Sequence, residues 1–178
     1  MKRYSDVVLL SGGVDSSYLA FTIKPERSPA MALFVDYGQP AAKKEERSAR
    51  VMAKAALLDF GKVSVHGLPL GDMSDWETGA AVVPARNLWL IAIGAAYGDR
   101  VWIGCVPEDF EDYADCRPKF LHDMGVAMNR AYGATVAYSP ATRAERVNFL
   151  RENELDPFAW SCYGPGPKPC GQCASCSQ

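Results

Sequence analysis

The sequence predicts an α/β fold in which a mostly parallel sheet is covered by helices on both faces. Short apolar segments alternate with longer segments of helical periodicity, and strands that alternate with helices form parallel sheets buried on both sides. The chain has 178 residues, of which 48% are hydrophobic, and a net charge of −2. This length and composition predict one domain, 1–178, with a substantial core. The composition changes only after Trp160, where Pro, Gly and Cys accumulate.

The elements of the first half follow from their apolar patterns. Val7–Leu10 is an apolar run and predicts a buried strand, and Ser16–Ile23 predicts the first helix. Ala30–Val35 is again apolar and predicts a strand. Ala41–Leu58 is rich in Ala, Lys, Glu and Arg with apolar residues on one side, which is typical of a surface helix. Lys62–Leu68 alternates apolar and polar residues, so we expect a third strand there.

The second half continues the alternation. Asn87–Tyr97 is strongly apolar and predicts a buried helix, followed by a short buried strand at Val101–Cys105. Pro118–Tyr132 predicts a helix, because proline fits the first turn. Thr135–Tyr138 predicts a short strand, and Ala141–Asn153 predicts the last helix. Loops that follow strands of a parallel sheet converge at one edge, where ligands bind.

The first predicted strand ends in a loop of small residues, Ser11 to Ser17. Gly12 and Gly13 permit close backbone approach, and the hydroxyls of Ser16 and Ser17 stand at a helix N-terminus, which attracts anions. The loop lacks the lysine and spacing of a Walker phosphate loop. It resembles the PP-loop of the ATP pyrophosphatases, which holds the departing pyrophosphate. The alternative is a plain strand–helix turn whose glycines serve packing.

Four of the six cysteines lie within the last 17 residues. Their spacing is C-x₇-C-x₂-C-x₂-C, formed by Cys162, Cys170, Cys173 and Cys176. Paired C-x₂-C steps and a distant fourth cysteine are typical of a tetrahedral, structural zinc site. We therefore expect a Cys₄ zinc knuckle in the tail 160–178. Four cysteines can also hold an iron–sulfur cluster, and free thiols in a frayed tail are the third interpretation.

Two further stretches concentrate charged and aromatic side chains. Val83–Asn87 precedes the apolar helix and contains Arg86, which is either an incidental helix-start residue or an anion clamp. Ile103–Pro118 brings acids, aromatics and an arginine into one loop after a strand. Loops of this kind usually carry function rather than core packing. The alternative is an acidic, solvated loop.

Taken in chain order, these motifs resemble those of the 7-cyano-7-deazaguanine synthase family of the queuosine pathway. The similar segments are Ser11–Ser16, Phe34–Gln39, Val83–Asn87, Tyr113–Phe120 and the tail from Trp160 through Cys176. This chain departs from the family pattern at three positions. Ala85 replaces a glycine, Pro40 replaces a basic residue, and Arg143 replaces a lysine. The segment Gly67–Val82 is also shorter than in the family.

The resemblance implies the PP-loop ATP pyrophosphatase fold, which is adenine nucleotide alpha hydrolase-like, and the activity of a carbon–nitrogen ligase. The implied reaction converts 7-carboxy-7-deazaguanine and ammonia to 7-cyano-7-deazaguanine (preQ₀). The carboxylate and then the amide are adenylated by ATP. The implied cofactors are ATP, Mg²⁺ and structural Zn²⁺.

The resemblance also implies the residues of the site. The expected catalytic residues are Asp15, Arg86, Arg117 and Arg143. The expected nucleotide-binding residues are Leu10, Ser11, Gly12, Gly13, Val14, Asp15, Ser16, Ser17, Asp36, Tyr37, Gly38 and Gln39. The expected substrate-binding residues are Arg86, Asn87, Asp109, Phe110, Tyr113, Asp115 and Arg117. The expected metal ligands are Cys162, Cys170, Cys173 and Cys176. No general base is identifiable, because His66 and His122 fall on a predicted strand and helix and are interpreted as structural.

Other functions stay open at this point. A variant that releases the amide 7-amido-7-deazaguanine, a PP-loop tRNA-thiolating enzyme and a non-enzymatic zinc module are the alternatives. The near-neutral charge argues against direct nucleic-acid binding, and no apolar run reaches the roughly 18 residues that span a bilayer. We expect small-molecule substrates, no membrane partner, a possible homodimer and a cytoplasmic location, since no signal peptide precedes the first strand.

Overall fold

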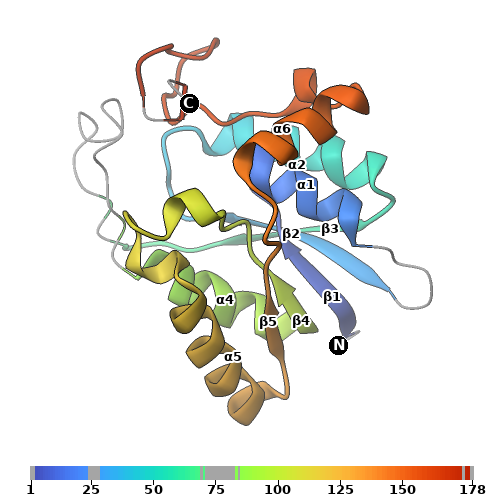
Figure 1. The fold of residues 1–178 in the computed structure, drawn as a ribbon, viewed down its shortest axis with the longest axis vertical. Coiled ribbons are helices and arrows are strands. Elements are labelled where there is room, and N and C mark those ends of the chain that lie inside the picture. The colour runs from blue at the N-terminus through green and yellow to red at the C-terminus, as the bar shows by residue number, and fades with distance from the viewer. Residues whose placement is uncertain are drawn as a thin grey trace.

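The computed structural model describes residues 3–23, 29–68, 70, 83, 85–173 and 175–176. Its described strands form one parallel sheet in the order β3-β2-β1-β4-β5 (Figure 1). The strands are β1 (Tyr4–Leu9), β2 (Ala30–Asp36), β3 (Asp59–Ser64), β4 (Gly98–Trp102) and β5 (Thr135–Ala137). Apolar residues of β1 and β2 are buried because helices cover both faces of the sheet. The predicted α/β fold class is confirmed.

Two helical layers cover the sheet. Helices α1, α2 and α6 lie on one face, and α4 and α5 lie on the other (Figure 1). Each layer closes its own apolar core, one around Val8, Leu19 and Met52 and the other around Val7 and Ile91. The helices are α1 (Val14–Thr22), α2 (Ala42–Ala55), α4 (Arg86–Tyr97), α5 (Pro118–Tyr132) and α6 (Arg143–Glu152). Short 3₁₀ turns lie at Pro107–Asp109, Ala114–Cys116 and Asp156–Phe158.

The strand order places a topological switch point at β1. This strand pairs with β2 on one side and β4 on the other, so the loops after β1 and β4 leave the sheet on opposite faces. Gly12 in the first loop has φ +84°, and a Cβ there would lie 2.6 Å from the backbone nitrogen of Ala49. A Cβ on Gly104 would lie 3.1 Å from the nitrogen of Ser16. The loops therefore pack closely at this point, as a binding crevice requires.

Two predicted strand positions are wrong. The third strand is Asp59–Ser64 rather than Lys62–Leu68, because its register with β2 starts where Asp59 pairs with Met31. The fourth strand is Gly98–Trp102 rather than Val101–Cys105. It follows α4 without a loop, since Gly98 can lie beside β1 where a Cβ would be 2.6 Å from Val7 Cγ2. The limits of both strands are set by pairing with neighbouring strands, which the apolar pattern of the sequence does not indicate.

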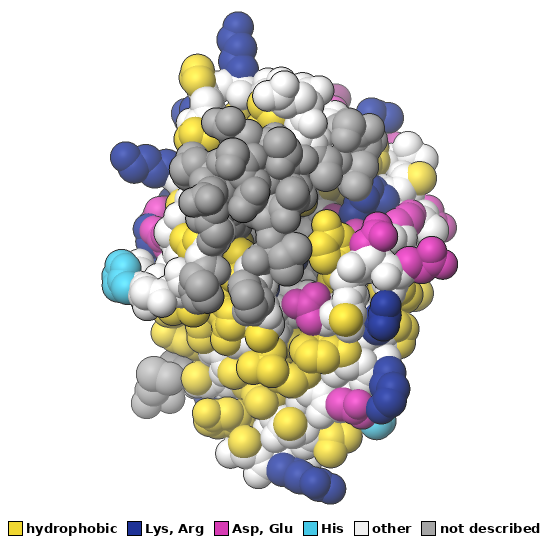
Figure 2. Space-filling model, turned by 90° about the vertical axis from the view of Figure 1, so that its left-hand side faces the viewer, with side chains coloured by type: hydrophobic (Ala, Val, Ile, Leu, Met, Phe, Trp, Pro, Cys, Tyr) yellow, Lys and Arg dark blue, Asp and Glu magenta, His cyan; other side chains and the backbone are white. Residues whose placement is uncertain are grey.

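Part of one face of the molecule is apolar. Figure 2 shows hydrophobic side chains gathering on the lower half of the face that carries α4 and α5. The large exposed hydrophobic residues of these two helices are Leu88, Val126 and Tyr132. Within the described residues, no helix combines the length and the apolar character that crossing a bilayer would require.

Candidate functional site

A cavity of about 360 Å³ opens at the carboxyl ends of β1, β2 and β4. Its walls come from the 11–17 loop, the end of β2, the start of α4, the loop after β4, and the C-terminal tail. Thirteen of the predicted site residues line it: Leu10, Ser11, Gly13, Val14, Asp15, Ser16, Tyr37, Gln39, Arg86, Asn87, Asp109, Tyr113 and Arg143. Segments far apart in the sequence therefore meet at the edge of the sheet where ligands are expected.

The remaining predicted nucleotide and substrate residues do not line the cavity; these are Gly12, Ser17, Asp36, Gly38, Phe110, Asp115 and Arg117. Several of them hold the walls in place. Asp36 forms an ion pair with Lys62 at 2.9 Å. Asp115 Oδ2 accepts a 3.1 Å hydrogen bond from the backbone nitrogen of Asn87, at the start of α4. Arg117 is exposed and donates to the carbonyl oxygens of Phe110 and Glu111, at 2.8 and 3.2 Å, so it fixes the loop after β4 from outside.

The 11–17 loop directs backbone N–H groups and hydroxyls toward one end of the cavity. Ser11 N donates to Ser16 Oγ at 3.2 Å, and Gly13 N lies 3.4 Å from Ser11 Oγ. Val14 N, in the first turn of α1, lies 3.4 Å from the hydroxyl of Ser161. These bonds to hydroxyls are long, and the helix dipole concentrates positive potential at this end of α1. The arrangement suits a phosphate group, which can replace the hydroxyls as acceptor.

A cluster of charges lies beside this loop. Asp15 Oδ1 lies 3.5 Å from Nη1 of Arg146, and Oδ2 lies 3.9 Å from Nε of Arg143. Arg143 also contacts Asp109 at 2.8 Å. Burial raises the pKa of Asp15 to about 6, although both arginines act in the opposite direction. Among the described residues, Asp15 Oδ1 is buried and accepts no hydrogen bond, so its interaction with Arg146 is electrostatic.

Arg146 is a site-supporting residue that the sequence interpretation missed. Its side chain is fully buried, with 0% exposed. It donates to the carbonyl oxygens of Cys105 and Ser139, at 2.8 and 2.9 Å, and to Ala141 at 3.0 Å. The arginine thus joins α6 to the loop after β4 and to Asp15 at once. The segment that forms α6 is rich in charged residues, and nothing in its sequence distinguishes Arg146 from an arginine that faces solvent.

The opposite wall contains a second missed residue, Glu45 in the first turn of α2. Its Oε2 accepts a 2.7 Å hydrogen bond from Nε2 of Gln39. Burial raises the pKa of Glu45 to about 7, while Gln39 and Arg86 act to lower it. Burial also raises the pKa of the neighbouring Tyr37 to about 12. The patterns that reveal helix α2 do not show that one of its glutamates faces the cavity.

Arg86 enters the cavity from an unusual backbone position. Ala85, the residue before it, adopts the left-handed conformation with φ +53° and ψ +30°. This conformation favours glycine. The family motif that Val83–Asn87 resembles has a glycine at this position, for this physical reason. Val83 is buried, and Pro84 of the same motif lies outside the described residues. Ala85 is thus a strained start for the helix that presents Arg86 and Asn87.

The C-terminal tail forms part of the cavity wall. Trp160 N donates a 2.9 Å hydrogen bond to the carbonyl oxygen of Gly12, which joins the tail to the 11–17 loop. Ser48 Oγ lies within 2.7 Å of the same carbonyl and within 2.6 Å of Phe158 O. The tail contributes Trp160, Ser161, Tyr163 and Ser175 to the cavity lining. The sequence interpretation assigned this segment only to metal binding.

The four tail cysteines converge as predicted. The sulfur atoms of Cys162, Cys170, Cys173 and Cys176 all lie within 4.8 Å of one another. Zn–S bonds of about 2.3 Å in a tetrahedron separate the sulfurs by about 3.8 Å. Backbone N–H groups support the sulfurs, as when Cys173 N donates to Cys170 Sγ at 3.3 Å. Such bonds lower the pKa of Cys170 to about 6 and favour the thiolate. The donor set and spacing fit a single structural metal ion.

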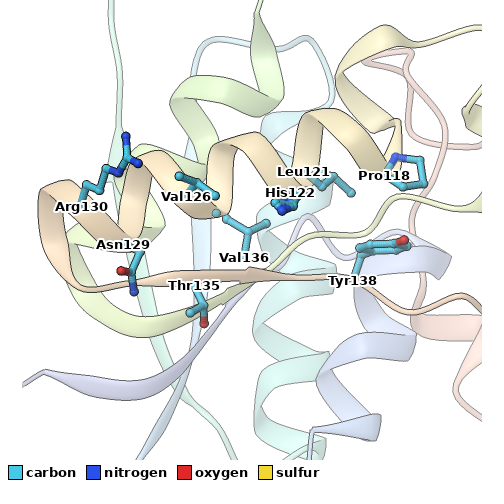
Figure 3. Close-up of a pocket in the computed structure, with 10 residues that line it drawn as sticks. Pro118, Leu121, His122, Val126, Asn129, Arg130, Thr135, Val136 and Tyr138 are labelled. Atoms are coloured by element: carbon cyan, nitrogen blue, oxygen red, sulfur yellow. The ribbon is translucent and has the colours of Figure 1, made fainter.

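A second hollow, of about 560 Å³, lies between α5 and β5 (Figure 3). Its walls include Leu121, Val126 and Tyr138, together with His122 and Arg130. It contains none of the predicted site residues. The 360 Å³ cavity therefore remains the candidate active site.

Known relatives match the chain over nearly its full length. A 7-cyano-7-deazaguanine synthase from Methanoculleus marisnigri is 33% identical over 204 aligned positions, which cover 96% of this chain and 89% of the relative. A synthase of the same name from Erythrobacter litoralis is 30% identical and covers 98% of this chain and 85% of the relative. The solved structure of NMN synthetase from Francisella tularensis is 13% identical and covers 88% of this chain and 87% of that chain, with a TM-score of 0.46. A structural similarity this low supports no inference about the present chain.

The family profile agrees with the curated relatives. The profile described as queuosine biosynthesis protein QueC matches residues 5–178, a range that includes both the 11–17 loop and the four-cysteine tail. The motifs that form the cavity and the knuckle thus fall within one continuous family match. The resemblance drawn from the sequence is confirmed, and the chain belongs to the QueC family of queuosine biosynthesis proteins.

Proposed function

We propose that this protein is an ATP-dependent 7-cyano-7-deazaguanine synthase, a carbon–nitrogen ligase that acts on 7-carboxy-7-deazaguanine and ammonia. The observation that carries the proposal is the cavity itself. It joins an anion-binding helix N-terminus, at Ser11 to Ser16, to a wall with Arg86, Asp109 and Tyr113. The first wall suits a nucleotide phosphate, and the second suits a carboxylated purine-like ring. The names of the full-length relatives support the same activity.

The nucleotide end supports phosphate departure. Backbone N–H groups of the 11–17 loop, together with Ser11 and Ser16 hydroxyls, are oriented to stabilise charge that builds on the leaving pyrophosphate. Arg143 lies beside this loop and supplies a further positive charge. Asp15, whose carboxylate lines the cavity beside the 11–17 loop, would hold Mg²⁺. When bound, Mg²⁺ shares the negative charge of the phosphates.

The substrate end supplies complementary groups. Arg86 can bind the carboxylate of the substrate, since guanidinium–carboxylate hydrogen bonds are strong. Asp109 can accept hydrogen bonds from the ring N1–H and amino group, and Tyr113 offers an aromatic surface. The contact of Asp109 with Arg143 at 2.8 Å holds that carboxylate in place at the cavity wall.

The proposed reaction has two adenylation steps. A carboxylate oxygen attacks the α-phosphorus of ATP and pyrophosphate leaves; ammonia then attacks the acyl carbon and AMP leaves, which gives the amide. The amide oxygen attacks a second ATP, and loss of AMP and protons from nitrogen leaves the nitrile. Each step depends on positioning and on charge stabilisation by the cavity walls.

The proposal extends to metal, partners and location. The four tail cysteines would hold structural Zn²⁺, which closes the tail against the cavity rather than entering the reaction. The partners would be small molecules in the cytoplasm, without nucleic acid or membrane. A homodimer remains a prediction.

The test is incubation with ATP, Mg²⁺, ammonium and 7-carboxy-7-deazaguanine, followed by mass spectrometry. Formation of the nitrile, with two AMP per product, supports the full proposal. Amide without nitrile supports the version that stops after the first adenylation. Unchanged acid refutes both versions.

Arg86→Gln is expected to lower turnover by about 10²-fold, because a charged partner of the substrate is lost. Exposed Arg47→Gln, on the outer side of α2, serves as control.

A further inference from the structure

The proposed reaction, on which this inference rests, needs a base that the sequence did not reveal. Ammonia is present at neutral pH mainly as ammonium, which has no lone pair with which to attack an acyl adenylate. A base inside the closed site must remove one proton. His66 is exposed, and His122 lines the separate hollow between α5 and β5. Neither histidine lines the cavity.

Glu45 lies where such a base is needed. Its side chain lines the same cavity as the 11–17 loop and Arg86. Gln39 holds its Oε2 at 2.7 Å, and the Gln39 amide is itself fixed by Tyr37 N at 2.9 Å and Val35 O at 3.3 Å. In the described part of the chain, Gln39 is the only hydrogen-bond partner of the Glu45 carboxylate. One carboxylate oxygen is thus held in place, while the other is available for a ligand.

The charges around Glu45 suit a proton acceptor. Burial disfavours the ionised form and raises its pKa to about 7, and Asp36 at the end of β2 acts in the same direction. Gln39 and, from α4, Arg86 act in the opposite direction and keep the carboxylate from being fully protonated. A base is most effective when its pKa lies near the working pH, because it is then both available and basic. An exposed glutamate would be a much weaker base.

We propose that the Glu45 carboxylate binds ammonium in the cavity and removes its proton, releasing ammonia beside the acyl adenylate. The proton moves from ammonium to a carboxylate oxygen of Glu45. The freed nitrogen lone pair forms the C–N bond, and the bond to AMP breaks with its electron pair on the phosphate oxygen. The second nitrogen proton passes to water, and Glu45 later returns its own proton to water. Glu45 acts only in the amide-forming half of the reaction, in which nitrogen enters.

The competing role is a counter-ion that only holds Arg86 in place. Glu45→Gln separates the two roles, because glutamine keeps the size and the contact to Gln39 but cannot take up a proton. Three readouts are compared: acid-dependent exchange of labelled pyrophosphate into ATP without any amine, amide formation with ammonium, and hydroxamate formation with hydroxylamine. Hydroxylamine is largely uncharged at neutral pH and therefore does not need the base. Glu46→Gln is the matched control, since Glu46 instead contacts Arg50 and Lys62.

The expected result is selective. Glu45→Gln lowers kcat/KM for ammonium by about 10²-fold or more, as loss of a general base does. Pyrophosphate exchange and hydroxylamine turnover stay within about twofold of the wild-type values, and Glu46→Gln behaves as wild type in all three assays. The wild-type kcat/KM for ammonium rises with pH through an inflection close to the Glu45 pKa of about 7, and the variant lacks this inflection.

Three results would overturn the inference. Equal losses with ammonium and hydroxylamine, or loss of pyrophosphate exchange, would show that Glu45 serves adenylation by holding Arg86 in place and does not act as a base. An unchanged ammonium response would leave Glu45 without a role in catalysis. Each of these three results requires a wild-type protein that exchanges pyrophosphate in the presence of the acid. Absence of that exchange in the wild type would refute the proposed function together with this inference, and is thereby distinguished from a failure at Glu45 alone.

Discussion

Single side chains in the cavity are held in electrostatic states that differ from those in water. Asp15 shows this best, because burial opposes its ionisation although Arg143 and Arg146 lie near its two oxygens. A carboxylate that is costly to ionise in the free protein gains when a cation joins it. The residue type and its place in the 11–17 loop could be predicted from the sequence. Its two arginine neighbours come from α6, more than 100 residues later, and could not be predicted.

The raised pKa of Asp15 predicts a pH dependence of stability. Between its ordinary value of 3.8 and its folded value of about 6, the folded protein holds a proton that the unfolded chain has released. The contribution of Asp15 to the free energy of unfolding therefore falls as pH rises through this window. Asp15→Asn lacks this contribution, so its stability relative to wild type should rise with pH by up to about 1.4 kcal/mol per unit.

Urea unfolding of both proteins at several pH values within that window is the measurement. Asp123→Asn is the control, because a hydrogen bond from Lys119 holds the pKa of Asp123 below its usual value. Its titration therefore lies below the window, and its stability difference should stay flat there. A flat difference for Asp15→Asn as well would contradict the electrostatic state described for the cavity.

At the scale of elements, α6 connects distant parts of the site. Thr142 caps this helix through a capping box with Glu145, and the first turn then presents Arg143 to the cavity and Arg146 to the interior. The helix and its start could be predicted from the sequence within two residues. The inward direction of Arg146 could not, because α6 has charged residues on several sides and no apolar stripe that fixes its orientation.

Removal of the Arg146 charge is expected to destabilise the protein strongly. Arg146→Met would leave the Asp15 carboxylate without its nearest cation and would remove the donors of four carbonyl oxygens. Breaking one partner of a buried ion pair costs about 3–5 kcal/mol. Denaturant unfolding measures the loss. Arg151→Met, at the exposed end of the same helix, should change stability by no more than about 0.5 kcal/mol. Similar small effects for both variants would show that Arg146 is not the link inferred here.

At the scale of the whole molecule, the last segment of the chain closes the site formed by the first loop. The tail binds back to Gly12 through Trp160, and its four cysteine sulfurs gather within 4.8 Å directly beyond that contact. A metal ion at the cysteines would fix Tyr163 and Ser175 against the cavity. The spacing of the cysteines predicts the ligand set, but it does not reveal that the tail forms a wall of the cavity.

Loss of the metal should therefore affect both stability and nucleotide binding. Cys173→Ser is expected to lose the bound metal, about one ion per chain in the wild type, and to unfold at a lower temperature, since metal binding contributes to folding. Elemental analysis, thermal unfolding and ATP calorimetry check this prediction, and the metal analysis distinguishes zinc from iron. Gln172→Ala, between two ligands, should keep the metal. A Cys173→Ser protein with full metal content would exclude the four-cysteine site.

The sequence by itself determined the α/β class, the loop at 11–17, the group of four tail cysteines and the family, because these depend on local patterns and fixed spacings. The tertiary structure decided the strand order, the true limits of β3 and β4, and which predicted residues meet in the cavity. It placed Arg86, Asp109 and Arg143 at the site, left Arg117 on the surface, and revealed Glu45 and Arg146. The reason is physical: burial and charge neighbours arise only when segments far apart in the chain pack together, so no local pattern contains them.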